Sequence, residues 1–199
     1  MFLFTKCTVV IGVMDEIDRV IIAALQQNGR ISLSEIGRRI GLSHVSVRRR
    51  LNNLSKNILK VTVGLNARKM GFHLAIVSAE VETPKRLQEI IRVLLNCPRV
   101  IFLAKVTGAY NLMAIMIAEN METLNAMVEH CSVRAYEGIR RSEVVIAEAP
   151  IIPEYLPVRM VVDRCSEIAP CGMECGECIR YKHEGCLACP ATKYYRGPL

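Results

Sequence analysis

The sequence lacks a long run of apolar residues, although 51% of its 199 residues are hydrophobic. The longest runs are Val9–Met14, which includes Gly12, and Leu112–Ala118. A helix that crosses a bilayer needs about 20 such residues. The sequence therefore argues against a membrane-spanning helix or a membrane partner, and it predicts a soluble protein with one large core or two small ones.

A complete secretion signal is also missing. Residues 1–13 are mostly apolar, but Lys6 interrupts them and no small-residue cleavage site follows. Met14 stands directly before the first helix signal, so residues 1–13 are either a short N-terminal arm or lie upstream of a start at Met14. Because no secretion signal directs the chain out of the cell, we expect a cytoplasmic protein. In that reducing compartment disulfides are uncommon.

Acidic residues are scarce in one segment. Between Arg30 and Lys60 the chain has eight basic residues against one acid, Glu35, so this segment carries a net charge equal to the +7 of the whole protein. A helical segment that concentrates positive charge in this way is typical of a surface that binds nucleic acid.

Helix signals organise residues 14–64 into a three-helix unit. Gly41 permits a tight turn between the second and third helices, as in a helix-turn-helix whose second helix enters the major groove of DNA. The β-branched run at residues 58–63 predicts the strand of a wing. The candidate N-caps are Asp15, Ser32 and Ser43. We therefore predict a winged helix-turn-helix domain that binds double-stranded DNA.

Three consecutive arginines lie on the polar side of the third helix. A solvated charged face is the alternative interpretation, but charge, turn and helix order together favour DNA binding. Arg48 and Arg49 are candidates for phosphate or guanine contacts, whereas Arg50 is better placed to bridge to the backbone or to pack along its stem. The predicted DNA-binding residues are Arg38, Arg39, Ser43, His44, Ser46, Arg48, Arg49 and Arg50.

After a hinge at residues 65–73, residues 74–160 alternate between strand and helix patterns. The predicted strands are 74–82, 100–106, 112–118 and 138–148, and the predicted helices are 84–96 and 121–131. The order βαββαβ predicts a ferredoxin-like domain, so the whole chain is of the α+β class. Because the strands at 100–106 and 112–118 are apolar on both faces, we expect a second copy to cover the sheet in a two-fold dimer.

Residues 161–199 have few large apolar side chains and no net charge, so they form a tail that is either disordered or held by its cysteines. Six of the nine cysteines fall within the last 35 residues. Paired CxxC motifs indicate zinc, while the final Cys-Pro also allows an iron–sulfur cluster. Structural disulfides and free thiols are the alternatives. The predicted metal ligands are Cys171, Cys175, Cys178, Cys186 and Cys189, whereas Cys7, Cys97 and Cys131 show no partner spacing and are interpreted as core or incidental.

Several motifs resemble the Lrp/AsnC, or feast/famine, family of transcription regulators. They are Asp15-Glu16-Ile17-Asp18, Asn28-Gly29-Arg30-Ile31-Ser32, Gly41-Leu42-Ser43 with Val47, Arg50, Leu51 and Leu54, and Val106-Thr107-Gly108-Ala109-Tyr110-Asn111. The resemblance covers about residues 14–160 and does not reach the cysteine-rich tail. It implies a DNA-binding domain joined to an effector-binding, dimerising domain, the RAM domain, which often assembles into tetramers or octamers.

The resemblance also implies a small-molecule effector, often an amino acid, at the turn between the second and third strands of the RAM domain. The matching residues are Gly108, Tyr110 and Asn111. Many relatives have acids beside this tyrosine, where this chain has Ala109 and Asn111, so acceptors for an amino group are missing here. A tight turn with an aromatic residue that caps the sheet is the alternative interpretation.

Two other functions remain open. The same two-domain architecture resembles enzymes that decarboxylate tetrapyrroles with the help of histidines. The predicted ferredoxin-like domain of this chain, residues 74–160, contains a single histidine, His130. A regulator in which the cysteine tail senses metal or redox state and the basic helix responds is compatible with DNA binding.

Overall fold

The computed structural model describes residues 14–131, 133 and 136–199. The chain divides into two compact units, Met1–Thr62 and Val63–Leu199. The expected N-terminal arm at residues 1–13 and Cys7 lie outside the described residues. Within the described part of the chain, no helix is both long and apolar enough to span a membrane.

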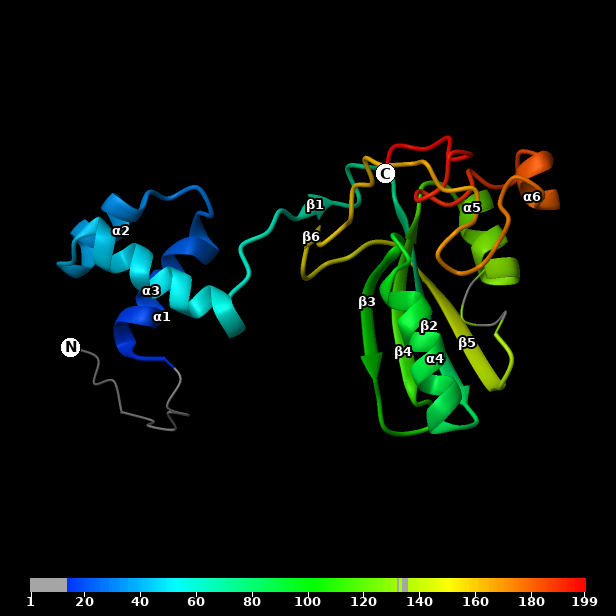
Figure 1. The fold of residues 1–199 in the computed structure, drawn as a ribbon, viewed down its shortest axis with the longest axis horizontal. Coiled ribbons are helices and arrows are strands. Elements are labelled where there is room, and N and C mark those ends of the chain that lie inside the picture. Colours follow the sequence, from blue (N-terminus) through cyan, green and yellow to red (C-terminus); the bar gives the residue numbers. More distant parts are fainter. Residues whose placement is uncertain (1–13, 132, 134–135) are drawn as a thin grey trace. The chain divides into compact units, whose positions relative to one another are not determined.

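The first unit contains three helices, α1 (Glu16–Gln27), α2 (Leu33–Ile40) and α3 (His44–Asn57), which confirm the predicted order (Figure 1). Asp15, Ser32 and Ser43 are the N-caps, and each accepts a hydrogen bond from the backbone N–H three residues later. The core is small and consists of Ile21, Ala24, Ile36 and Val47, one or two from each helix.

The turn between α2 and α3 depends on two glycines. Gly41 has φ 70° at the C-cap of α2, a left-handed conformation that glycine adopts without strain. The N–H of Leu42 donates to the carbonyl of Gly37 at 2.9 Å, and a Cβ added to Gly37 would lie 2.3 Å from the carbonyl oxygen of Leu42. Only glycine at position 37 therefore lets the turn approach α2 this closely.

The predicted wing strand is wrong. Residues 59–64 have no regular structure, and the side chains of Val61 and Val63 are 57% and 74% exposed. The first strand after α3 is β1 (Leu65–Asn66), which pairs with β6 (Tyr155–Leu156) of the second unit. A β-branched run favours extended backbone, but no described strand of the three-helix unit is available to pair with it.

The second unit contains a four-stranded antiparallel sheet in the order β3-β4-β2-β5, which confirms the ferredoxin-like arrangement. In chain order its elements are β2 (His73–Val81), α4 (Pro84–Leu95), β3 (Val100–Lys105), β4 (Leu112–Ala118), α5 (Met121–Ala126) and β5 (Ile139–Ala147). The predicted helix 121–131 is not α-helical throughout, because α5 continues as a π-helical turn, η1 (Met127–Cys131).

The two faces of the sheet are covered differently. On one face Val77 and Met116 pack against Ile90 and Leu94 of α4 and Leu124 of α5. The other face presents an apolar row, Phe102, Ile115, Ile76 and Val145, which are neighbours in register across all four strands. Phe102 is 47% exposed and Val145 is 50% exposed, so this face is open in the single chain.

Residues 161–199 pack onto the ferredoxin-like domain, whereas the sequence left only disorder or cysteine linkage for this segment. Tyr195 and Leu199 are buried against Phe72, Leu74 and Ile117, at one end of the otherwise open sheet face. The segment, including the short helix α6 (Ile179–Lys182), also lies beside α5 (Figure 1). Its apolar residues are too few for a core of their own but sufficient to complete one.

Candidate DNA interface, effector hollow and cysteine cavity

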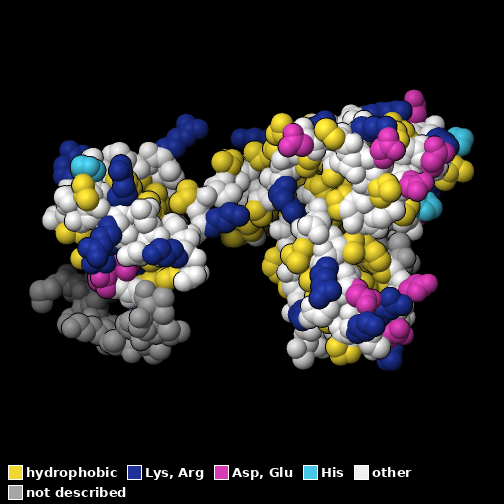
Figure 2. Space-filling view, in the orientation of Figure 1, with side chains coloured by type: hydrophobic (Ala, Val, Ile, Leu, Met, Phe, Trp, Pro, Cys, Tyr) yellow, Lys and Arg dark blue, Asp and Glu magenta, His cyan; other side chains and the backbone are white. Residues whose placement is uncertain are grey.

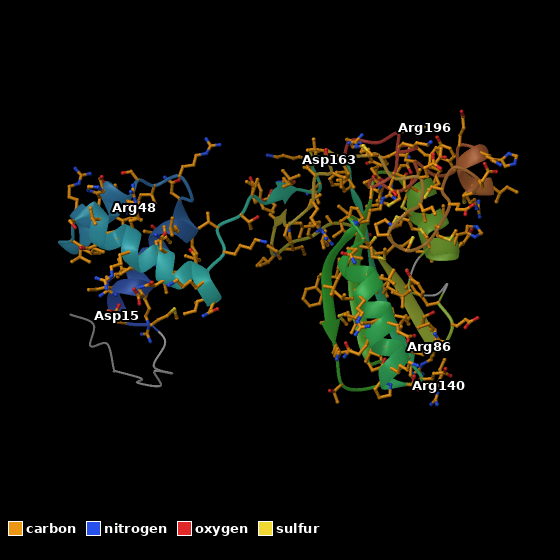
Figure 3. All side chains as sticks on the ribbon, in the orientation of Figure 1. Asp15, Arg48, Arg86, Arg140, Asp163 and Arg196 are labelled. Carbon is orange, nitrogen blue, oxygen red and sulfur yellow. The ribbon has the colours of Figure 1, made fainter. Side chains whose placement is uncertain are left out.

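The exposed side of α3 carries two arginines that bind no other side chain among the described residues. Arg48 and Arg49 are both exposed, and neither has an ion-pair partner among the residues that the structure describes. Lys and Arg side chains are spread over the visible face of this unit (Figure 2), and Arg48 projects from α3 (Figure 3). These two guanidinium groups are free to bind an external anion.

The N-terminal end of α3 presents the other predicted base contacts. The N–H of Ser46 donates to Oγ of Ser43 at 3.2 Å, and the two hydroxyl oxygens are 3.0 Å apart. His44 and Ser46 are exposed at this end. Hydroxyl groups and helix N–H groups in this position suit phosphate or base-edge acceptors.

Arg50 differs from its two neighbours. Its Nη1 lies 2.7 Å from Oδ2 of Asp15 and 2.8 Å from Oδ1 of Asp18, so it joins α3 to the first turn of α1. Asp15 also accepts a hydrogen bond from the N–H of Asp18 at 2.9 Å. This backbone hydrogen bond and Arg50 together hold the pKa of Asp15 below its usual value. Within this chain, Arg50 therefore organises the helices.

Arg38 and Arg39 share one acid. Nε of Arg39 lies 3.0 Å from Oε1 of Glu35, and Arg38 pairs with the other oxygen of the same carboxylate. The side chain of Arg38 is nevertheless 77% exposed. Exposed pairs of this kind are weak, so both arginines can still turn toward a phosphate.

The predicted effector residues line an open hollow of about 510 Å³ at one end of the sheet. The hydroxyl of Tyr110 donates to Oε2 of Glu143 at 3.1 Å, and the guanidinium of Arg141 lies 4.8 Å from the centre of its ring. Burial and the hydrogen bond to Glu143 raise the pKa of Tyr110. Gly108, with φ 144°, forms the turn beside the tyrosine.

Asn111 has partners within the protein. Its side-chain Nδ2 donates to the carbonyl of Val81 at 2.7 Å, and its Oδ1 accepts from the N–H of Val81 at 2.9 Å. The side chain thus completes backbone pairing beside the irregularity that follows Glu80 in β2. This arrangement shapes the wall of the hollow and leaves little of Asn111 for a ligand.

Sequence reasoning missed four charged residues that line the same hollow. Glu80 and Glu82 come from the end of β2, and Arg140 and Arg141 come from the start of β5. The pairing of β2 with β5 brings Glu80 opposite Arg141 in register. Acceptors that seemed to be missing beside Tyr110 are therefore supplied by a neighbouring strand, a signal that only the strand order could reveal.

The five predicted metal ligands line the same cavity, which has a volume of about 50 Å³ and is partly open. Cys97 and Cys131 of the ferredoxin-like domain line it as well, although neither has a neighbouring cysteine at metal-ligand spacing in the sequence. The exposed Cys165 is not among the lining residues. The cavity lies where the C-terminal segment meets β4, α5 and η1, which explains why two cysteines distant in sequence belong to it.

No three described His, Cys, Asp or Glu side chains converge closely enough to hold a single metal ion. Burial raises the pKa of the Cys97, Cys175 and Cys186 thiols, and it raises the pKa of Cys189 to about 12. A metal that binds as a thiolate complex would therefore displace protons from these groups.

Comparison with known proteins identifies the family. The AsnC-type helix-turn-helix domain matches residues 14–55, and the Lrp/AsnC ligand binding domain matches residues 74–154. An uncharacterised HTH-type transcriptional regulator of Pyrococcus horikoshii is 32% identical over 135 residues, which make up 67% of this chain and 85% of the relative. The chain belongs to the Lrp/AsnC family. It is a DNA-binding transcription regulator with a ligand-binding domain, as its motifs predict.

Other Lrp/AsnC proteins support the assignment. The transcriptional regulator LrpA of Pyrococcus horikoshii is 28% identical over 119 residues, covering 59% of this chain and 84% of LrpA. The structure of Escherichia coli AsnC aligns with TM-score 0.61 at 18% identity and covers 70% of this chain and 95% of AsnC. A Neisseria meningitidis transcriptional regulator in complex with L-methionine gives TM-score 0.61 at 18% identity, with coverages of 69% and 92%. At these identities the two structures show the fold alone.

The family and these relatives are transcription regulators and not enzymes. No described feature favours the decarboxylase alternative: His130 is partly exposed at the end of η1, where Arg180 and Glu129 are its neighbours. The cysteine-rich segment of this Lrp/AsnC protein lies beyond both matched ranges.

Proposed function

We propose that α3 of this regulator enters the major groove of cytoplasmic DNA, with Arg48 and Arg49 on phosphate or guanine and His44 near base edges. The supporting observation is that these two arginines have no partner within the described part of the chain, whereas Arg38, Arg39 and Arg50 each contact an acid. Ser43 and Ser46 supply hydroxyl groups at the start of the same helix. A cation without an internal partner loses no existing contact when it binds DNA.

The remaining predicted DNA contacts have supporting roles in this proposal. Arg38 and Arg39, at the end of α2, contact the DNA backbone without regard to sequence. Arg50 fixes the position of α3 through Asp15 and Asp18 and does not read bases.

Two copies of the chain would present two such helices. The apolar row of Phe102, Ile115, Ile76 and Val145 supports a dimer in which the open sheet faces pack together, because burying these side chains in a second copy removes apolar surface from water. A two-fold dimer would bind pseudo-palindromic sites, and it could assemble further into tetramers or octamers.

The hollow at Tyr110 suits a small zwitterion such as an amino acid. Glu80 and Glu82 can accept from an ammonium group, and Arg140 and Arg141 can donate to a carboxylate. Gly108 leaves open space beside the turn, and Asn111 maintains its shape. One site therefore offers both negative and positive side chains, which match the two charges of a zwitterion.

The cysteine-rich segment binds metal in this proposal, either as zinc or as an iron–sulfur cluster. Support comes from the convergence of Cys171, Cys175, Cys178, Cys186 and Cys189 on one cavity, which is unexpected of loose thiols. A metal there would fasten the segment to the effector domain and could report on redox state.

Selection of bound fragments from genomic DNA tests the main proposal. We expect the full chain to enrich pseudo-palindromic sites, with half-sites about one helical turn or a multiple apart. The Arg48→Ala/Arg49→Ala double variant should enrich none, while Arg19→Ala, a change on α1 at an arginine that pairs with Glu16, should enrich the same sites. Failure of the native chain to bind any duplex in dilute salt, where counterion release favours binding most, would refute it.

A further inference from the structure

The cysteine cavity leaves more internal space than four thiolates around one zinc ion would leave. Four thiolates at about 2.3 Å from one zinc ion lie only about 3.8 Å from each other, in contact, and leave no internal space. This cavity instead leaves an internal volume of about 50 Å³. By the same measure one water needs about 10–15 Å³, so the space accommodates a group of several atoms.

The arrangement of the thiols agrees with the volume. Seven cysteines line the cavity, yet no three described metal-binding side chains approach closely enough to share one ion. Thiols that surround a space without meeting in its centre are spaced for a polynuclear group, which carries its own bridging atoms. We propose that this cavity binds an iron–sulfur cluster through four cysteine thiolates. The inference depends on the metal binding proposed above and specifies the metal.

A buried donor without a partner supports this assignment. Arg99 lines the cavity, and its side chain is only 4% exposed. Its Nη2 donates to Glu119 at 2.8 Å, but its Nε is buried and has no hydrogen-bond partner among the described residues. Buried donors are nearly always paired, and hydrogen bonds to the sulfur atoms are a feature of iron–sulfur sites.

A second such group lies nearby. The hydroxyl of Tyr136 is buried and has no described partner, and it lies within electrostatic range of the Cys97, Cys131 and Cys171 thiols. A cluster bound by four thiolates brings acceptor sulfur atoms and negative charge into this region. The orphaned Nε of Arg99, which lines the cavity, would then have an acceptor. The hydroxyl of Tyr136 does not line the cavity but would lie close to the added negative charge.

The local sequence and backbone hold the ligands around the space. Cys171, Cys175 and Cys178 come from one loop, and Cys186 and Cys189 come from the next, followed by Pro190. Gly176 lies against the ring of Tyr194. A Cβ added to Gly176 would be 2.5 Å from a ring carbon, so a larger residue would not fit there. The N–H of Leu187 donates to Oγ1 of the fully buried Thr123 at 3.1 Å, which fixes the second loop to α5.

The full chain, purified without oxygen and then reconstituted with ferric iron, a thiol reductant and sulfide, tests the inference. We expect about four iron and four sulfide per chain and an absorption band near 400 nm that oxygen bleaches. Zinc at one per chain, with no iron or sulfide retained after zinc removal and reconstitution, would overturn the cluster while metal binding stands. A colourless protein without any metal, and with all thiols titratable, would overturn both.

Matched cysteine variants locate the cluster. Cys175→Ser and Cys186→Ser should each reduce the iron content and the 400 nm band at least several-fold, whereas Cys165→Ser, at an exposed cysteine that does not line the cavity, should retain both. Equal cluster content in all three variants would overturn the assignment. Because a cysteine variant could also fail to fold, helical content is compared by circular dichroism.

Tyr136→Phe provides a test that does not remove a ligand. It deletes one hydroxyl and keeps the ring, so the cluster should form with the same iron content. Loss of a donor near the sulfur atoms should shift its reduction potential to a more negative value. An unchanged potential would show that Tyr136 does not act on the cluster. If Cys175→Ser also retained the cluster, the proposed site would be wrong.

Discussion

Arg99 and Glu119 form a buried ion pair in which Nη2 lies 3.0 Å from Oε1 and 2.8 Å from Oε2, and their side chains are only 4% and 3% exposed. The hydroxyl of Tyr195 donates to the same carboxylate, and the N–H of Leu199 donates to Oη of Tyr195 at 2.8 Å. Burial and the hydrogen bond to Glu119 raise the pKa of Tyr195. This chain of contacts fastens the end of the protein to the ferredoxin-like domain.

Replacing Glu119 should destabilise the second unit. Glu119→Ala leaves the Arg99 cation buried without its counter-ion, which costs about 3–5 kcal/mol in comparable buried pairs. We expect a lower midpoint in urea-induced unfolding followed by circular dichroism. The control is Glu137→Ala: its side chain is 90% exposed and lies 3.5 Å from Arg86, and its loss should leave the midpoint unchanged. Equal midpoints for both variants would contradict a stabilising role for the pair.

The N–H of Asp18 and the guanidinium of Arg50 both stabilise the charged carboxylate of Asp15, which predicts a pH dependence in the three-helix unit. Since the folded state lowers the pKa of Asp15, its contribution to stability is present above the ordinary aspartate pKa of about 3.9 and is lost as pH falls through the lower, folded value. Asp15→Asn keeps an N-cap but removes the charge. We expect it to melt at lower temperature than the native chain at pH 7, with the difference shrinking below about pH 4. A difference that does not vary with pH would exclude the ion pair as its cause.

The sequence predicted features that depend on near neighbours. Caps at Asp15, Ser32 and Ser43 are decided within three residues, so the helices that they begin were confirmed. The ferredoxin-like strands were confirmed to within one or two residues, because their apolar stretches, such as Leu112–Ala118, lie between turn residues. The structure tests neither the DNA contacts nor the effector contacts, which stay predictions.

Features that depend on distant pairing were missed. The run at 58–63 has strand composition, but composition does not supply a partner. The described strand that follows it, β1, pairs with β6, which is about 90 residues later in the chain. Cys97 and Cys131 have no spacing motif, and their place beside the cysteine-rich segment follows from how that segment packs. Arg50 looks like Arg48 and Arg49 in a helical pattern, and only the position of α1 separates them.

Gly37 is expected to be essential for the helix-turn-helix. Gly37→Ala would place Cβ 2.3 Å from the carbonyl oxygen of Leu42, so the turn must move, at a cost typical of overpacking, about 1–3 kcal/mol. Gly29→Ala is the matched control, because its Cβ would meet only the carbonyl oxygen of Leu25 at 3.9 Å. Thermal unfolding of both variants, with DNA affinity as a second readout, should show a loss for Gly37→Ala alone. Comparable stability of the two would show that the turn adapts.

We expect a substitution in the hollow at Tyr110 to weaken effector binding without changing metal content. Calorimetric titration with a panel of amino acids should identify a ligand, and Glu80→Gln should weaken that ligand at least tenfold because the ammonium group loses a charged acceptor. Glu89→Gln, on α4 and outside the hollow, should bind as the native chain does. The hollow is formed by the end of the domain that carries Arg140, opposite the end that carries Arg196 (Figure 3), so metal content should be unaffected. An affinity that survives Glu80→Gln would place the ligand elsewhere.

Arg49→Ala separates DNA binding from folding. Its side chain has no ion-pair partner among the described residues, so removing it should leave the melting temperature unchanged, unlike Arg50→Ala, which breaks the contact with Asp15 and Asp18. Operator affinity should fall by about 1–3 kcal/mol if Arg49 reads a base. If it binds a phosphate, the dependence of log affinity on log salt should decrease by about one unit and the loss should be the same for unrelated duplexes.

Gel-shift titrations at several salt concentrations, with Arg19→Ala as the control of equal charge change, distinguish these outcomes. Loss of affinity in Arg19→Ala equal to that in Arg49→Ala would mean that net charge, and not the face of α3, determines binding.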